Sequence, residues 1–427
     1  MRKAGIVCAM LLMFLLPSTG PAFGGAGMAA ESQVDKLVAK LVQKGILTTE
    51  EAMELKQEVA LEAKQGTGAA QQSVKSEVPE WVQNTRLTGD FRVRNQLEHR
   101  RTEGPSEVTR DRVRMRARLG LETKVNDRFK MAVGIATDGG SARSTNQTFD
   151  SNFAKGNVAL NYAYGQYIPN DQWTLTGGQM KNPIWEPMEF LWDSDITPTG
   201  GAAQYHYKLS DALNVFALGS GFVVKELIAS SADPVIYVGQ LGVKGKLSGG
   251  KTDYKLAGAY QYFANNSKVT LQSSANNTIA ASQYTHTYHQ PMGFAEIGIN
   301  DPLGKGFRLH VPRVAVFGEF VHNPDPADEN NAWMIGTYFG NSTVADKGAW
   351  KATWAYKSLG RDAWLDVLPD SDFYGGATDS QGYEAVLEYG LAKNVTVAVD
   401  YYHTRRKSSL AAPAQESLLQ TDINLKF

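Results

Sequence analysis

The sequence predicts an all-β transmembrane barrel of about sixteen antiparallel, up-and-down strands, preceded by a short α-helical segment. Three observations lead to this class. Segments of roughly ten residues alternate apolar and polar side chains, long and short connections follow one another, and the final alternating segment ends in Phe427. After the N-terminus no apolar stretch reaches the ~18 residues of a transmembrane helix. A barrel strand gives no signal in a hydropathy average, because its polar residues alternate with its apolar residues and offset their hydropathy.

Residues 1–30 have the pattern of a secretory signal peptide. Arg2 and Lys3 precede the apolar run Gly5–Leu16, and small residues follow it. This run is too short to span a bilayer as a helix, which takes about 20 residues. An uncleaved signal anchor is the alternative. The only cysteine, Cys8, lies inside the run, so the mature chain has no disulfide and no cysteine metal site.

Residues 31–65 are helical in pattern and 66–80 form a polar linker, which leaves residues 81–427 for the barrel. Apolar residues recur at three- and four-residue spacing from Val34 to Val42, and Thr48 with Glu51 forms a capping box for a second helix. These helices are too short and polar to bury a core alone. We expect them to pair with each other or with neighbouring chains; a solvated hairpin without a partner is the alternative.

Sixteen alternating segments follow the linker, and a strand count of fourteen or eighteen stays open. They lie near 85–100, 111–125, 129–138, 157–169, 172–183, 200–209, 213–224, 234–247, 252–265, 292–301, 313–323, 332–341, 348–360, 382–392, 395–406 and 417–427. Outer-membrane barrels have an even strand number, short periplasmic turns and long extracellular loops. The connection 302–312 is long for its class. A soluble β-sandwich is the competing architecture, but lysine and aspartate on the polar parity of many strands favour a water-filled lumen.

The second predicted strand carries the most informative charge pattern. Alternate residues are basic, at a spacing of about 6.8 Å along the strand. The other parity is apolar and must face lipid, because a charge there costs about 2–4 kcal/mol at the midplane. The basic residues therefore face the lumen, where guanidinium groups attract anions. This predicted ladder comprises Arg110, Arg112, Arg114, Arg116 and Arg118, extended by Arg92 and Arg94 on the neighbouring strand.

The third long connection, residues 184–199, is too apolar for a loop wholly in water. We expect it to fold inward and narrow the pore, with its acids opposite the arginines; a packed external cap is the alternative. Such a pair of charged walls orients polar solutes and lowers net ion selectivity. The candidate residues are Trp185, Glu186, Glu189, Trp192, Asp193 and Asp195.

Other functional classes lack support in the sequence. Removal of Arg2 and Lys3 lowers the formal net charge from −1 to about −3, whereas nucleic-acid binding usually shows a strongly basic domain. Serine, histidine and aspartate are scattered, and no nucleophile motif such as Gly-x-Ser-x-Gly is present. The sequence therefore predicts no catalytic residues, no metal site and no cofactor. The terminal Phe427 closes an alternating strand, as in proteins recognised by the barrel-assembly machinery.

Three phrases carry a family resemblance: Gly45-Ile46-Leu47-Thr48-Thr49-Glu50-Glu51-Ala52, Asp111-Arg112-Val113-Arg114-Met115-Arg116-Ala117-Arg118, and Lys181-Asn182-Pro183 leading to Trp192-Asp193. With the exported N-terminus they resemble the putative-porin family of proteobacteria, over most of the chain. The arginine-rich strand is the most specific phrase. The resemblance implies a porin barrel in the outer membrane of a Gram-negative bacterium, a homo-oligomer with a trimer as the expected state, and helices in the periplasm.

Together these observations predict a passive diffusion channel for small hydrophilic solutes, with a preference for anions. Its expected partners are outer-membrane lipid, small hydrophilic solutes or ions, other copies of the chain and the assembly machinery. The main alternative is a structural barrel that sheathes an exported partner such as an electron-transfer protein. An enzyme on a barrel scaffold is a more distant alternative.

Overall fold

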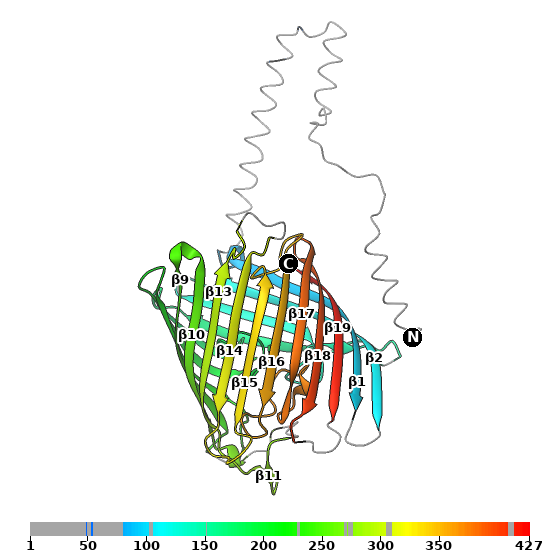
Figure 1. Ribbon diagram of the computed structural model, residues 1–427. Helices are drawn as coiled ribbons and strands as arrows, with labels where there is room; N and C mark the ends of the chain where they lie inside the picture. The colour runs from blue at the N-terminus through cyan, green and yellow to red at the C-terminus, as the bar shows by residue number, and fades with distance from the viewer. Residues whose placement is uncertain are drawn as a thin grey trace. The chain divides into compact units, whose positions relative to one another are not determined.

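The computed structural model describes residues 80–101, 106–150, 152–228, 231–268, 276–304, 310–408 and 414–427, together with 48, 53 and 271. The chain divides into two compact units, Met1–Asn84 and Thr85–Phe427, and the second is a β-barrel (Figure 1). The predicted signal peptide, helices and linker lie outside the described residues, apart from positions 48, 53 and 80. No helix among the described residues has the length and hydropathy needed to cross a membrane.

Long strands form the barrel wall, and a few short elements lie in the connections. The wall strands are β1 (Thr85–Arg101), β2 (Glu107–Lys124), β3 (Phe129–Thr137), β5 (Val158–Tyr167), β6 (Trp173–Gln179), β7 (Thr199–Lys208), β8 (Asn214–Val223), β9 (Val235–Leu247), β10 (Thr252–Ala264), β13 (His289–Asn300), β14 (Arg313–His322), β15 (Asn331–Gly340), β16 (Trp350–Leu359), β17 (Ser380–Ala392), β18 (Val395–Arg406) and β19 (Gln415–Lys426). The short elements are α4 (Glu80–Gln83), β4 (Gln147–Thr148), β11 (Ile279–Ala280), β12 (Gln283–Tyr284) and the 3₁₀ turns η1 (Ser248–Gly250), η2 (Asn266–Lys268) and η3 (Tyr374–Gly376).

The sheet closes on itself, because the first strand pairs with the last. β1 and β19 are antiparallel neighbours from Asp90 opposite Lys426 to Arg101 opposite Gln415. Each wall strand also pairs antiparallel with its sequence neighbour; β4 is a short piece that pairs with β2. The result is a closed barrel of 16 strands, which confirms the predicted fold class and strand count. Closure removes the open edges that would otherwise leave backbone groups unpaired in lipid.

The alternation along each strand places apolar side chains on the outer face of the barrel and both polar and apolar side chains on its inner face. β15 illustrates the pattern: Trp333, Ile335 and Phe339 are 40, 51 and 42 % exposed, whereas Met334 and Tyr338 on the opposite parity are buried. Large apolar side chains exposed on strand after strand would be costly in water. They suit a wall whose outer face meets acyl chains.

The two ends of the barrel differ in the length of their connections. At one end, called here the turn end, short turns join the strands; in one of them the side-chain oxygen of Asn126 accepts hydrogen bonds from the backbone N–H groups of Arg128 and Phe129 at 3.0 Å. At the other, the loop end, the connections are long. In outer-membrane barrels the turn end faces the periplasm and the loop end faces outward.

Outward-facing aromatic residues gather near both ends. Phe129 stacks on Tyr167 near the turn end, at a centroid distance of 4.9 Å. Trp333 stacks on Tyr356 at 5.6 Å near the loop end. Amphipathic rings at these two heights correspond to the aromatic girdles that flank the apolar band of membrane barrels.

Candidate functional site

The candidate arginines share the inner face of β1 and β2. The β1–β2 register sets Arg92 opposite Arg116 and Arg94 opposite Arg114, so four of them form a block two strands wide. Arg94 and Arg114 are buried, at 5 and 9 % exposure, and the intervening residues of both strands are apolar and outward-facing. Arg110 lies near the loop end and is exposed. We call all seven arginines the arginine wall.

Carboxylates from four parts of the chain pair with this wall. Arg94 holds Asp422 of β19 through Nε at 2.7 Å and Nη2 at 2.8 Å, and its Nη1 lies 3.0 Å from Asp372. Arg116 and Arg118 share Asp90 of β1, at 2.9 and 2.7 Å. The carboxylates within 4 Å of the wall, among the described residues, are Asp90, Glu98, Asp195, Asp372 and Asp422.

The wall retains positive charge, because seven arginines face five carboxylates. Arg114 binds neutral acceptors instead: the side-chain oxygen of Gln96 at 3.2 Å, the Ser144 hydroxyl at 3.1 Å and the Asn146 backbone carbonyl at 3.1 Å. A positive excess beside an aqueous cavity raises the local concentration of anions.

The predicted constriction loop, residues 184–199, lies against the inner wall. The backbone N–H of Trp185 donates to the Gln240 side-chain oxygen at 3.0 Å, and the Gln240 amide donates back to the Trp185 carbonyl at 2.9 Å. Further along, the Thr197 hydroxyl donates to the Asn161 carbonyl of β5 at 2.6 Å. The loop is therefore fixed to β9 at one end and to β5 at the other.

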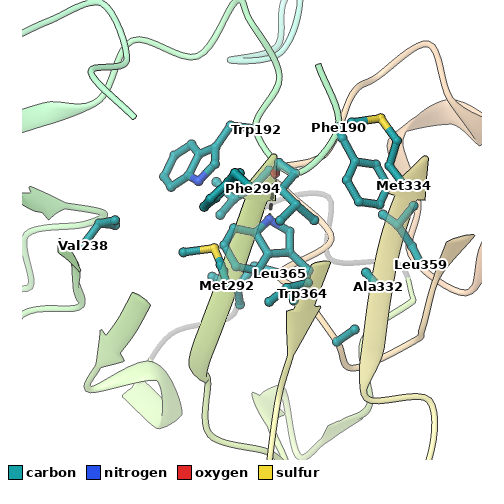
Figure 2. Packing of buried hydrophobic residues seen from close by; sticks show 14 of the residues in the cluster. Phe190, Trp192, Val238, Met292, Phe294, Ala332, Met334, Leu359, Trp364 and Leu365 are labelled. Atoms are coloured by element: carbon teal, nitrogen blue, oxygen red, sulfur yellow. Dashed lines mark hydrogen bonds between the residues drawn. The ribbon is translucent and has the colours of Figure 1, made fainter. Parts of the chain in front are cut away.

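The middle of this loop belongs to an apolar core inside the barrel. Phe190 and Trp192 are 1 and 5 % exposed, and Trp192 packs edge-on against Trp364 at a centroid distance of 6.5 Å. Figure 2 shows Trp364 beside Met292 and Phe294, which project inward from β13. Side chains of β8 to β16 and of two loops thus fill their half of the interior with apolar groups.

The second of these loops, residues 360–379, was not singled out from the sequence. Its Trp364 is fully buried and donates through Nε1 to the Leu191 carbonyl at 2.7 Å. The Asp193 N–H donates to the Leu368 carbonyl at 2.7 Å, which joins the two loops again. Tryptophan and leucine in a long connection are the signal that could have revealed this loop, since they also marked residues 184–199.

Arg143, in the connection between β3 and β5, was also missed. Its guanidinium Nη1 donates to the backbone carbonyls of Asp366 and Pro369 at 3.2 Å and of Gly376 at 2.7 Å. Because three carbonyls of the 360–379 loop converge on one guanidinium group, these contacts fix the course of the loop. Arg143 therefore acts as a positioning residue for that loop.

Only one of the four loop acids meets the arginine wall. Asp195 lies 3.4 Å from Arg118 and accepts hydrogen bonds from the backbone N–H and the hydroxyl of Thr145 at 3.0 and 3.1 Å. Among the described residues, Glu186, Glu189 and Asp193 have no arginine of the wall within 4 Å, but they line the same cavity as Arg118. That they oppose the arginines stays a prediction.

Glu186 and Glu189 are partly buried and Asp193 is buried. Burial raises the pKa of Glu186 to about 8 and that of Asp193 to about 7. The Asp193 carboxylate accepts hydrogen bonds from the backbone N–H groups of Asp195 and Ser371, both at 2.9 Å. Glu189 accepts one from the Ser194 N–H at 2.7 Å. Of the three, Asp193 joins the two loops through its hydrogen bond from Ser371.

Lys357 of β16 is the cation at the centre of this region. Its fully buried ammonium lies 2.6 Å from Glu384 and 3.0 Å from Asp370, and it donates to the Glu189 carbonyl at 2.8 Å. Carboxylate oxygens of Glu189, Asp193 and Asp370 lie within 4.8 Å of one another. Oxygen donors of this kind suit a hard cation such as Ca²⁺. Lys357 already supplies a positive charge to Asp370 there.

Two cavities meet near Arg118, the one member of the arginine wall that lines either of them. One, of about 750 Å³, opens toward the turn end and includes Asp90 and Arg118 in its lining. The other, of about 550 Å³, opens toward the loop end and includes Arg143. Four residues line both cavities: Asn161, Asp195, Ile196 and Thr197. The Arg118–Asp195 ion pair thus stands where the cavities meet.

The terminal residue Phe427 extends the pairing of β19 with β1. Its N–H donates to the Gly89 carbonyl at 3.0 Å, and the Gly89 N–H donates to the Phe427 carbonyl at 3.1 Å. Its ring lies against Gly89, where any side chain would collide with it. The terminal phenylalanine therefore completes the barrel seam at the turn end.

Similar structures share this fold at low sequence identity. OprB of Pseudomonas putida matches with a TM-score of 0.52 and 11 % identity, over 81 % of this chain and 95 % of OprB. The outer membrane channel DcaP of Acinetobacter baumannii matches with a TM-score of 0.44 and 14 % identity, over 80 % and 97 %. A mutant of the Rhodopseudomonas blastica porin gives 0.44 and 11 %, over 80 % and 100 %. A search of curated proteins finds no relative of this sequence.

A family model gives the assignment. The model described as "Putative porin" matches residues 102–303 and 307–427, which is well over half of the chain and includes the arginine-rich strand β2. The closed barrel, its apolar outer face and its polar inner wall agree with this match. The chain therefore belongs to the putative-porin family and is an outer-membrane channel protein.

Proposed function

We propose that the channel conducts small hydrophilic solutes by passive diffusion and prefers anions. The observation that carries this proposal is the excess of arginine over carboxylate on the arginine wall, whose Arg118 lines the cavity of about 750 Å³ at the turn end. Guanidinium stays charged at every physiological pH, so the bias toward anions is permanent. A barrier to cations follows from the same charge.

The preference is modest, because acids stand close to the arginines. Asp195 lies across the cavity junction from β2 and pairs with Arg118 at 3.4 Å. An acid and a base on opposite sides of a narrow passage create a transverse field. Such a field orients dipolar solutes while it reduces the net charge that an ion meets. We therefore assign residues 184–199 the role of constriction loop, with Asp195 as the acid that faces the solute.

The remaining partners are proposed from the family and the fold. The apolar outer face is suited to outer-membrane lipid, and Phe427 at the seam is suited to recognition by the barrel-assembly machinery. Family resemblance supports a homotrimer with the N-terminal helices in the periplasm. A barrel that sheathes an exported protein receives less support, because the chain's own loops take up the half of the interior lined by β8 to β16.

Ion selectivity in planar bilayers tests the proposal. In a KCl gradient the reversal potential of the wild-type channel should indicate chloride preference, and Arg112→Gln, Arg114→Gln and Arg116→Gln together should shift it toward cations. Arg118→Gln alone should shift it in the same direction, and it removes a side chain that is 32 % exposed rather than deeply buried. Arg128→Gln, in an exposed turn, is the matched control. Unchanged reversal potentials in both wall variants would contradict the proposal.

A further inference from the structure

A second basic region lies inside the barrel, away from the arginine wall. A cavity of about 1,580 Å³ opens at the turn end beneath the constriction loop, against strands β7 to β10 and β13 to β16. Its basic lining consists of Lys208, Lys244, Lys246, Lys255, Arg313 and Lys351. None of these residues belongs to the ladder that the sequence indicated.

Every carboxylate in this lining is already bound. Asp211 pairs with Lys208 at 2.7 Å. Asp253 pairs with Arg313 and accepts from the Asn300 amide at 3.0 Å. Glu296 accepts from Arg313 at 2.8 Å and from the Tyr338 hydroxyl at 2.9 Å. The lining acids are therefore engaged by four other groups, and among the described residues Lys244, Lys246, Lys255 and Lys351 have no carboxylate within 4 Å.

Lys244 and Lys255 are the centre of this excess charge. They face each other directly in the β9–β10 register, on the inner side of both strands. Like charges directly opposite each other destabilise a pair of strands. Within the part of the chain that the structure describes, neither ammonium has a carboxylate within 4 Å. The next residue along the row beyond Lys244 is Asn214, which is neutral. Beyond Lys255 it is Glu296, whose carboxylate accepts hydrogen bonds from Arg313 and Tyr338.

Aromatic rings hold two of the lysines in place. The Lys255 ammonium lies 4.2 Å from the ring centroid of Trp185 in the constriction loop and 5.0 Å from that of Phe216. The Lys351 ammonium lies 4.7 Å from the Tyr338 ring. Cation–π contacts position a cation but leave its charge in place. The cavity thus presents ordered ammonium groups that still need an anion.

We propose that Lys244 and Lys255 form a binding site for a small oxyanion, of the phosphate or carboxylate type, at the turn-end exit of the pore. The inference rests on the proposed anion channel and names its solutes more narrowly. An oxyanion between the two ammonium groups would accept charge-assisted hydrogen bonds from both and remove their mutual repulsion. Anions leaving the arginine wall would then meet a second positive surface before entering the periplasm.

Binding can be measured without conduction. The full-length protein in detergent should broaden the ³¹P resonance of inorganic phosphate at low ionic strength. Lys244→Gln together with Lys255→Gln should weaken phosphate binding about tenfold or more, because both charge-assisted hydrogen bonds to the anion are lost. Lys393→Gln, in an exposed turn outside the cavity, should leave the broadening unchanged. Equal broadening by wild type and the double variant would overturn the site.

A bilayer experiment separates this site from the proposed function. Phosphate added at the turn end should reduce the chloride current of the wild type and of Lys393→Gln but not that of the double variant. Chloride preference without phosphate binding would overturn the oxyanion site and leave the anion channel standing. Phosphate binding that requires both lysines, in a channel without anion preference, would support the site and contradict the proposed function. A double variant that fails to fold is replaced by Lys244→Gln alone, for which the same outcomes are expected.

Discussion

The two halves of the barrel interior differ in the side chains that line them. Beside β1, β2 and β19 the inner side chains are arginines and aspartates, and two cavities meet near Arg118. Beside β8 to β16 many inner side chains are apolar and buried, and loops 184–199 and 360–379 pack onto them. Toward the turn end the same strands carry the basic lining of the large cavity, so the apolar cover extends over only part of this half.

This difference shows where solutes travel. A polar inner wall needs water or counter-charges, and here it has both cavities and acids. Apolar side chains on the inner wall have to be shielded from water, and here the two loops shield them. The barrel is wider than the passage it needs, so an apolar core fills part of the interior and leaves the arginine wall and the large turn-end cavity to solutes. We expect the arginine wall, Asp195 and the turn-end lysines to decide selectivity, not the whole circumference.

The covered half should lose the most stability when its buried cation is removed. Lys357→Met leaves Asp370 and Glu384 without their counter-charge inside the core. Loss of one partner of a buried ion pair costs about 3–5 kcal/mol. The loss in the free energy of unfolding can be measured by urea unfolding of the barrel refolded in micelles. Lys393→Met, in an exposed turn, is the control; a Lys357→Met variant as stable as that control would show that the cluster does not hold the loops.

The hydrogen bond between the two loops should contribute less. Trp364→Phe keeps a ring in the core but leaves the Leu191 carbonyl without its donor. A buried acceptor without a partner costs about 1–3 kcal/mol. We expect a lower free energy of unfolding and noisier single-channel currents, because the loops are less firmly joined. Trp333→Phe, on the outer face, should change neither quantity, and equal effects of the two substitutions would contradict the role of the loop contact.

The covered half should also make stability depend on pH. Burial raises the pKa of Glu186 from its ordinary 4.5 to about 8, so between these values the folded chain holds a proton that the unfolded chain has lost. Stability from this group is present at pH 4 to 5 and is lost as the pH rises toward 8. Unfolding at pH 5 and pH 9 should show a smaller difference in Glu186→Gln than in the wild type or in the exposed-loop control Glu226→Gln. Identical pH dependence in all three would refute the assignment.

The smallest change in stability is expected on the conducting side. Asp195→Asn keeps an acceptor for Thr145 but removes the negative charge that faces Arg118. Stability should fall by about 1 kcal/mol or less, because a charged hydrogen bond becomes a neutral one. The ratio of anion to cation permeability should rise. A fall in that ratio would show that Asp195 does not face the permeating ion.

The sequence predicts the barrel well, because alternation and connection length are local patterns. β2 illustrates this: basic and apolar residues alternate from Arg112 to Leu119, and lipid allows only one orientation. The site is less predictable, because its partners are distant in sequence. Asp422 meets Arg94 only through closure of the barrel, and Asp372 reaches it from the 360–379 loop. The apolar content of residues 184–199 predicts that this loop folds into the barrel. The direction in which each of its acids points depends, however, on the packing around Trp192 and Trp364.

Cysteine accessibility tests most directly whether solutes pass on one side only. The chain's single cysteine, Cys8, lies in the predicted signal peptide, so introduced thiols are unique. Thr197→Cys lines both cavities, whereas Ala332→Cys faces inward from β15 with no exposed surface. A charged methanethiosulfonate reagent should modify Thr197→Cys rapidly and reduce its current, while Ala332→Cys stays unmodified until the protein is unfolded. Equal modification of both thiols in the native channel would contradict the division of the barrel into a conducting and a covered half.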